Sequence, residues 1–206
     1  MATPCVILDI GGVLELTPET GWVQRWEERL RLPPGTVHER MRDVWQAGSV
    51  GRVSERQVHE EAGLRLGLSV AEVDAFMADL WEEYLGAPNE ELIAHVRGLR
   101  ALRGRCRLGI LSNSFVGARE RESGRYAFDE LVERIVYSHE IGVEKPDPEA
   151  FGAVCESLGV RPESCLFVDD AEPNVLAARA VGMQAHLFED NARTIARITA
   201  HLQDVS

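Results

Sequence analysis

Four separated points of the chain carry side chains that suit phosphate chemistry. Carboxylates offer hard oxygen ligands of the kind that Mg²⁺ binds, and a lysine ammonium is a compact charge that pairs well with a phosphate oxygen. Phosphoryl transfer depends mainly on positioning and charge neutralisation, so these residue types together indicate that chemistry. The residues are Asp9, Ser112-Asn113, Lys145 and Asp169-Asp170.

Lys145 is the one lysine among 22 basic residues, and it lies within Glu144-Lys145-Pro146-Asp147-Pro148. Every other residue of that group is an arginine, a residue that suffices wherever a surface or an ion pair needs positive charge. A single lysine is also compatible with a merely arginine-rich composition. Its carboxylate neighbours favour a functional interpretation, in which an ammonium contacts a phosphate oxygen.

The elements that must position these residues form an alternating β and α pattern. Residues 4–10 are apolar on both faces, as in a central parallel strand, and end at Asp9-Ile10-Gly11-Gly12. Further strands are predicted at 108–111, 134–137, 164–168 and 184–188, with helices at 148–158, 173–181 and 192–202. The carboxyl ends of parallel strands share one edge, so we expect the candidate residues to converge there.

Residues 16–90 show helical periodicity and no strand pattern. Helices are predicted at 20–31 and 36–45, and Ser54 and Ser69 begin capping boxes that open two more. We therefore predict an α/β fold, with a Rossmann-like parallel sheet core of residues 1–15 and 91–206. An all-helical cap of residues 16–90 would be inserted after the first strand.

Composition limits the partners. The 206 residues fit one domain with an insertion, and the net charge of −12 argues against nucleic acid and against an anionic membrane surface. No apolar run is long enough to span a bilayer, and no secretory segment follows Met1. We expect a cytoplasmic protein, a monomer or weak homodimer, that binds a small phosphorylated molecule. Its four cysteines lack metal-ligand spacing and are expected to be buried thiols: Cys5, Cys106, Cys155 and Cys165.

The order of the motifs resembles that of the haloacid dehalogenase-like (HAD) hydrolase superfamily with a type 1 helical cap, over essentially the whole chain. The first motif is similar to Asp9-Ile10-Gly11-Gly12-Val13-Leu14 and the second to Leu111-Ser112-Asn113. The third corresponds to 144–148 and the fourth to 167–174. The Asp-x-Gly of the first motif resembles that of α-D-glucose-1-phosphate phosphatase-like members.

This resemblance implies roles for the site residues. Asp9 would be the nucleophile that forms an aspartyl phosphate. Lys145 would bridge Asp9 and the phosphate, and Asn174 would orient the acidic loop. Mg²⁺ would bind Asp9, the Gly11 carbonyl and Asp170, with help from Asp169. The phosphate would be held by Gly11, Gly12, Ser112, Asn113 and Lys145.

The first motif departs from the usual phosphatase form at Gly11, where a second Asp normally protonates the leaving group. Three interpretations remain open. In the first, which we favour, the chain is a Mg²⁺-dependent phosphatase for a small metabolite with a relatively acidic leaving group, such as a sugar phosphate. In the second, it is a 2-haloacid dehalogenase, although Gly11-Gly12 and Asp169-Asp170 argue against that. In the third, it is a phosphate- and metal-binding module with weak or no activity.

The predicted cap holds all four tryptophans, of which most are expected to pack its own core. Trp22 and Trp26 are candidates for the substrate pocket, and Arg25 and Arg42 for contacts with a polar substrate. The loops at 15–19 and 85–89 are the expected hinges.

Overall fold

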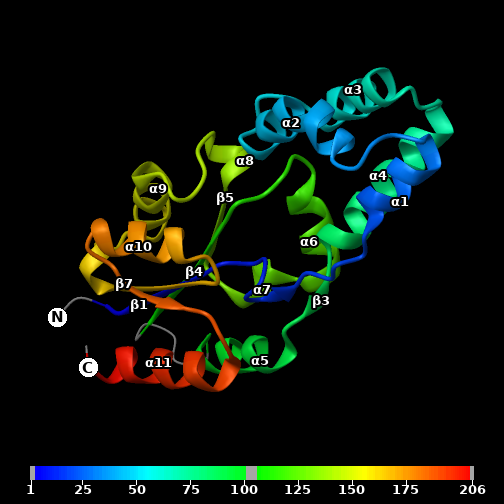
Figure 1. Cartoon of the computed structure of the whole chain (residues 1–206). Helices are drawn as coiled ribbons and strands as arrows, with labels where there is room; N and C mark the ends of the chain where they lie inside the picture. Colours follow the sequence, from blue (N-terminus) through cyan, green and yellow to red (C-terminus); the bar gives the residue numbers. More distant parts are fainter. Residues whose placement is uncertain (1–2, 101–105, 205–206) are drawn as a thin grey trace.

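The computed structural model describes residues 3–100 and 106–204, and its core is a five-stranded parallel sheet (Figure 1). The strand order is β5-β4-β1-β6-β7, so the first strand lies at the centre. All four neighbouring pairs are parallel, which confirms the predicted Rossmann-like α/β fold. The strands are β1 (Cys5–Leu8), β4 (Arg107–Ser112), β5 (Arg134–Tyr137), β6 (Cys165–Asp169) and β7 (Gln184–Leu187).

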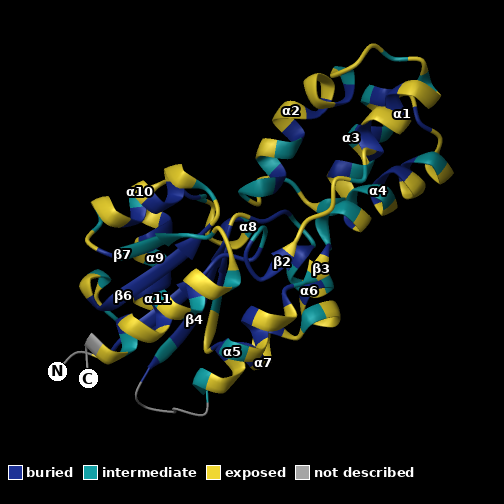
Figure 2. Cartoon of the chain, turned by 60° about the horizontal axis from the view of Figure 1, so that its bottom comes forward, coloured by how far each residue is buried: buried dark blue, intermediate teal, exposed yellow. Residues whose placement is uncertain are grey.

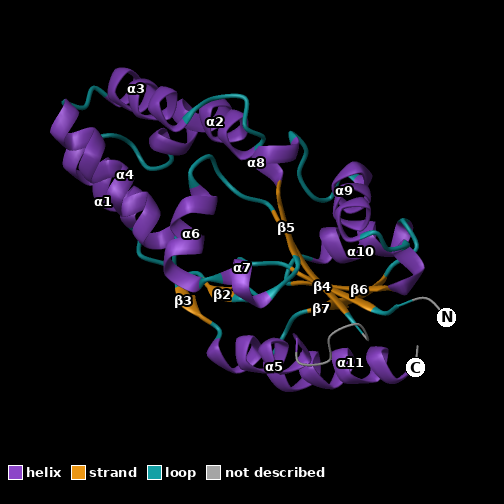
Figure 3. Cartoon of the chain, turned by 180° about the vertical axis from the view of Figure 1, so that it is seen from behind, coloured by secondary structure: helices purple, strands orange, loops and turns teal. Residues whose placement is uncertain are grey.

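Helices cover both faces of the sheet, which explains why β1 is apolar throughout (Figure 3). On one face, α5 (Glu90–Arg100), α7 (Phe128–Leu131) and α11 (Asn191–Asp204) pack in one apolar cluster with residues of β1, β4 and β6. On the other face, α9 (Pro148–Leu158) and α10 (Glu172–Ala180) pack in a second cluster. This layering leaves the carboxyl edge of the sheet as the place where loops meet.

The inserted segment is a group of four helices with an apolar cluster of its own. Figure 1 shows these helices to one side of the sheet, beyond the carboxyl ends of its strands. Capping boxes at Ser54 and Ser69 open the third and fourth of them, as predicted. The helices are α1 (Trp22–Leu30), α2 (Thr36–Ser49), α3 (Glu55–Leu66) and α4 (Val70–Tyr84).

The prediction that residues 16–90 contain only helices is wrong at both ends of that range. Strands β2 (Glu15–Leu16) and β3 (Ala87–Pro88) pair antiparallel where the chain enters and leaves the four-helix group (Figure 2). Two residues are too few to show the alternation that marks a strand, so periodicity could not reveal them. This short ribbon joins the four helices to the core.

Three α-helices among the described residues were not predicted. The first, α6 (Ala118–Tyr126), lies between the core and the inserted helices and has the sequence ARERESGRY, which carries few apolar residues. The others, α7 and α8 (Ser138–Ile141), are single turns. Charged composition and short length explain why no apolar periodicity marked them.

Two expectations related to compartment can be compared with the structure. The four cysteines are buried and unbridged, as predicted. Among residues 3–100 and 106–204, no helix combines the length and the apolar character needed to cross a bilayer. The cytoplasmic location itself stays a prediction.

Candidate active site

Three adjacent strands deliver the candidate residues to one edge. Asp9 follows β1, Ser112 ends β4 and Asp169 ends β6, and the register pairs Leu8 of β1 with Ile110 and Val168 on either side. Since all three strands run in the same direction, their ends lie side by side. The loop before α9 brings Lys145 to the same place.

Lys145 is buried between two carboxylates. Its Nζ lies 2.8 Å from Asp9 Oδ1 and 2.7 Å from Asp169 Oδ2, and the side chain is 0% exposed. The Phe167 ring lies beneath it, with the ring centroid 5.4 Å from Nζ. Two carboxylates neutralise this buried ammonium. Because both contact the same nitrogen, the ammonium fixes the distance between the Asp9 and Asp169 carboxylates.

Asn113 holds the backbone of this lysine. The Lys145 N–H donates to Asn113 Oδ1 at 2.7 Å, and Asn113 Nδ2 donates to the Lys145 carbonyl at 2.8 Å. The side chain of Asn113 is therefore occupied in joining the loop after β4 to the loop before α9. The sequence did not predict this bidentate contact.

Asp169 anchors the acidic loop after β6. Its Oδ1 accepts hydrogen bonds from the Ala171 N–H at 2.8 Å and from Asn174 Nδ2 at 3.0 Å. Asp169 is fully buried, whereas Asp170 is exposed. The bonds to Asp169 fix the turn that brings the Asp170 carboxylate next to Gly12.

The three carboxylates form a concentrated negative cluster. Ligand oxygens of Asp9, Asp169 and Asp170 all lie within 4.8 Å of one another. Burial raises the pKa of Asp9 to about 7, with Lys145 opposing the shift and Asp169 adding to it. Burial and the charge of Asp169 also raise the pKa of Asp170. One ammonium does not balance three carboxylates, and this set of hard oxygen donors fits Mg²⁺.

The two glycines after Ile10 differ in their surroundings. Gly12 has a φ of +71°, and a Cβ placed on it would overlap the Asp170 carboxylate. Glycine is therefore required there for the close approach of the acidic loop. A Cβ on Gly11 would meet nothing within 4 Å, so the space in front of Gly11 is open.

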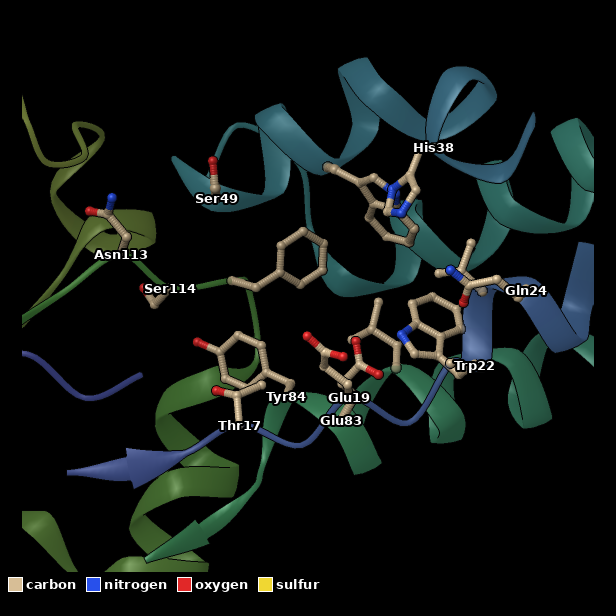
Figure 4. Close-up of a pocket in the computed structure, with 15 residues that line it drawn as sticks. Thr17, Glu19, Trp22, Gln24, His38, Ser49, Glu83, Tyr84, Asn113 and Ser114 are labelled. Atoms are coloured by element: carbon tan, nitrogen blue, oxygen red, sulfur yellow. The ribbon is translucent and has the colours of Figure 1, made fainter. Parts of the chain in front are cut away.

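A cavity of about 840 Å³ lies between the inserted helices and the sheet edge (Figure 4). Trp22 lines it, whereas Trp26 packs edge-on against Phe76 in the helical cluster and donates to Asp79. Neither Arg25 nor Arg42 is among the described residues of its wall. Four aromatic rings contribute to the lining, from Trp22, Trp45, Tyr84 and Phe115.

A smaller cavity of about 100 Å³ lies beside Gly11. It shares Thr17, Tyr84 and Asn113 with the large cavity, so the two spaces adjoin. Glu122 of α6 also lines it. Sequence analysis missed Tyr84 and Glu122, because neither belongs to a motif and only the tertiary fold brings them to Gly11.

The comparisons with known proteins agree with this geometry. The family model described as haloacid dehalogenase-like hydrolase matches residues 3–182. The chain belongs to the haloacid dehalogenase-like hydrolases. This confirms the resemblance inferred from the motifs and makes the chain a HAD-like hydrolase.

Several relatives of this HAD-like hydrolase are phosphatases. It is 38% identical to Phosphatase MT3486 of Mycobacterium tuberculosis over 89 residues, which span 43% of this chain and 41% of that protein. It is 31% identical to phosphoglycolate phosphatase of Cereibacter sphaeroides over 135 residues, which span 66% of this chain and 57% of that protein. The matches thus span less than two thirds of these relatives.

A solved structure with a similar fold is the HAD family enzyme bt-2542 of Bacteroides thetaiotaomicron. The TM-score is 0.76 at 19% identity, over 94% of this chain and 98% of that one. The same enzyme has been solved in complex with magnesium and inorganic phosphate, and that structure gives a TM-score of 0.71 at 20% identity, over 93% of this chain and 98% of that one.

Proposed function

We propose that this HAD-like hydrolase is a Mg²⁺-dependent phosphatase that acts on a small phosphorylated metabolite through an aspartyl phosphate. The observation that carries the proposal is the pairing of buried Lys145 with Asp9 and Asp169, beside Asp170. The phosphatase relatives and the magnesium and phosphate complex of a protein with the same fold support it.

Asp9 is the proposed nucleophile. The Ile10 N–H donates to its Oδ1 at 2.7 Å, and Lys145 contacts the same oxygen. Both contacts orient the carboxylate, and we assign the attack on phosphorus to Oδ2. The ester P–O bond breaks as the Asp9–phosphorus bond forms, and water then cleaves the aspartyl phosphate to release phosphate.

The remaining site residues hold charge and phosphate. Asp9, Asp169, Asp170 and the Gly11 carbonyl are the groups that would hold Mg²⁺, which when bound neutralises phosphate charge. Ser112, Lys145 and the backbone N–H groups of Gly12 and Asn113 are assigned to the phosphate oxygens. Lys145 is already held by its two carboxylate partners, so this cation needs little reorganisation during the reaction.

Residues 16–90 are the proposed cap, and the large cavity beneath them is the proposed site for the leaving group. Its volume of about 840 Å³ accommodates a sugar, and Thr17, Gln24 and Glu83 offer hydrogen-bonding groups beside the aromatic rings. No arginine or lysine is among the described residues of the wall. This favours a neutral sugar phosphate over a substrate with a second anionic group, such as phosphoglycolate.

A second candidate is a binding module with weak activity, which Gly11 favours because it cannot donate a side-chain proton. A 2-haloacid dehalogenase, the other alternative, needs no metal and would make no use of the acidic cluster.

Phosphate release separates these candidates. We expect turnover of p-nitrophenyl phosphate and of sugar phosphates with Mg²⁺, loss with EDTA, and loss in Asp9→Asn. Chloride release from 2-chloropropionate without metal would instead identify a dehalogenase. Binding of Mg²⁺ and phosphate with no turnover of any ester would identify the module.

A further inference from the structure

Position 11 poses a problem for the proposed function. A departing alkoxide needs a proton, and general acid catalysis contributes about 10²- to 10⁴-fold to such steps. Gly11 has no side chain to supply one. Yet the space in front of Gly11 is open and leads into the cavity of about 100 Å³, so another group can reach this point.

Glu122 is a carboxyl group on the wall of that cavity. It is buried, with 2% of its surface exposed, and its Oε2 accepts a hydrogen bond from the Tyr137 hydroxyl at 2.6 Å. Burial raises its pKa to about 7, and the hydroxyl groups of Tyr137 and Tyr84 oppose this shift. A carboxyl group in this condition gives up and regains a proton near neutral pH, as acid–base catalysis requires.

Tyr84 lines the small cavity together with Glu122 and Gly11. It ends α4 and lines both cavities, and in Figure 4 its hydroxyl points toward the side where Asn113 and Ser114 lie. Burial raises the pKa of this phenol well above 10, and the charges of Glu122 and Asp9 add to the shift. The shared lining of the small cavity places this tyrosine beside Glu122 and Gly11.

We propose that Tyr84 and Glu122 together replace the missing acid–base Asp, with Tyr84 touching the leaving oxygen and Glu122 supplying the proton. The inference rests on the proposed phosphatase function. When the ester P–O bond breaks, the leaving oxygen takes the Tyr84 proton and Tyr84 takes the Glu122 proton, so Glu122 becomes a carboxylate. When water attacks the aspartyl phosphate, its proton returns through Tyr84 to Glu122 and Asp9 leaves as a carboxylate.

Glu15 also lines the small cavity, and burial raises the pKa of its carboxyl group as well. We assign it a positioning role because it belongs to β2 and packs within the ribbon. Its Oε2 accepts from Thr17 Oγ1 at 2.8 Å, and a Cβ on Gly86 would overlap its Oε1. The carboxyl group is thus packed against the ribbon of β2 and β3. Glu122 instead comes from α6 and lines the cavity beside Tyr84, which also lines the large cavity.

The transfer of a proton from Glu122 through Tyr84 to the leaving oxygen is a proton relay. The dependence of the rate on the leaving group tests this relay. For an alkyl phosphate, whose alkoxide needs a proton, Glu122→Gln and Tyr84→Phe should each lower kcat/KM about 10²-fold. For p-nitrophenyl phosphate, whose phenolate leaves unprotonated, the loss should be less than about 5-fold. A general structural defect would lower both rates alike. Gly11→Asp added to Glu122→Gln should restore alkyl phosphate turnover, because the open space admits the usual acid.

Two controls isolate the effect. Glu27→Gln removes a buried carboxylate that binds the Gly35 and Val37 N–H groups in the helical insert, away from the cavity, and should show no dependence on the leaving group. If Glu15→Gln shows the dependence and Glu122→Gln does not, Glu15 is the acid and our assignment is wrong.

Equal losses on both substrates in Glu122→Gln and Tyr84→Phe would also overturn the relay, while Mg²⁺-dependent turnover that Asp9→Asn abolishes would leave the phosphatase function standing. If the wild-type protein releases no phosphate from p-nitrophenyl phosphate, from sugar phosphates or from the alkyl phosphate, the phosphatase function itself fails. Thermal unfolding of each variant checks that it folds.

Discussion

Lys145 is held by its surroundings so closely that its chemical type matters as well as its charge. Its ammonium contacts Asp9 and Asp169 at 2.8 and 2.7 Å, above the Phe167 ring and out of contact with solvent. A guanidinium is larger and planar, and it cannot place one nitrogen between both carboxylates in the same space.

We therefore expect Lys145→Arg to lower kcat/KM for p-nitrophenyl phosphate about 10²-fold or more, the usual loss when one preorganised charge donor is displaced. Steady-state kinetics measures the loss, and circular dichroism with thermal unfolding confirms that the variant folds. Near wild-type turnover in Lys145→Arg would remove the proposed role.

The raised pKa of Glu122 makes the free energy of unfolding depend on pH, and the direction of the shift predicts the direction of that dependence. Its pKa rises from 4.5 to about 7 on folding because of burial, in a setting that includes Tyr137, Tyr84, Glu15 and Arg119. The folded protein keeps a proton that the unfolded chain releases above pH 4.5. The stabilisation is complete below that pH and is lost as pH rises through 7.

Relative to Glu122→Gln, the wild-type free energy of unfolding should fall by about 1–3 kcal/mol between pH 5 and pH 8. Urea unfolding of both proteins in EDTA measures the difference, since comparison with the variant cancels the titration of Asp9. A difference that stays constant, or grows in favour of the wild type as pH rises, contradicts the raised pKa.

At the scale of elements, periodicity and capping in the sequence predicted the longer helices and the strands of the core. The core strands and helices α9, α10 and α11 lie within a few residues of their expected places, because each buries an apolar face. The convergence of Asp9, Lys145 and Asp169 also followed from parallel strand ends. The ribbon of β2 and β3 was too short to show a period. Tyr84 and Glu122, which line the small cavity with Gly11, come from α4 and α6. No sequence spacing relates those helices to the first motif.

The turn after β1 allows the acidic loop after β6 to approach it closely, because Gly12 has no Cβ. Gly12→Ala should weaken Mg²⁺ binding by about tenfold or more, because the new Cβ overlaps Asp170 and displaces a carboxylate of the acidic cluster. Isothermal titration with Mg²⁺ measures the loss. Gly159→Ala is the matched control: it has a similar φ of +65° but nothing within 4 Å of the new Cβ, at the end of α9.

Both glycine variants should lose stability through the left-handed backbone that alanine disfavours, by about 1 kcal/mol or more. Only Gly12→Ala should lose metal affinity. Equal Mg²⁺ affinity in Gly12→Ala and the wild type would show that Asp170 does not depend on this close approach.

For the whole molecule, the inserted helices contact the core at several places besides the ribbon, and two of these contacts adjoin the loops of the site. Phe115, which follows β4, lies in the helical cluster with its ring 5.6 Å from that of Trp45. Ser49, at the end of α2, donates to Glu144 Oε2 at 3.0 Å, next to Lys145 in the chain. Movement of the insert would therefore be transmitted to the loops that hold the nucleophile and its cation.

We expect the insert to close when the site is filled, because exclusion of water during phosphorylation requires it. In the presence of Mg²⁺ and beryllofluoride, a phosphate analogue, backbone amides at 15–19 and 85–89 should exchange hydrogen more slowly than in the protein alone. Exchange in α9, which lies in the core, should stay unchanged, and Asp9→Asn should abolish the response because the analogue needs the carboxylate. Mass spectrometry locates the protected segments. If both segments exchange equally fast with and without the analogue, the ribbon is not a hinge, and the large cavity must take up its substrate with the insert fixed in place.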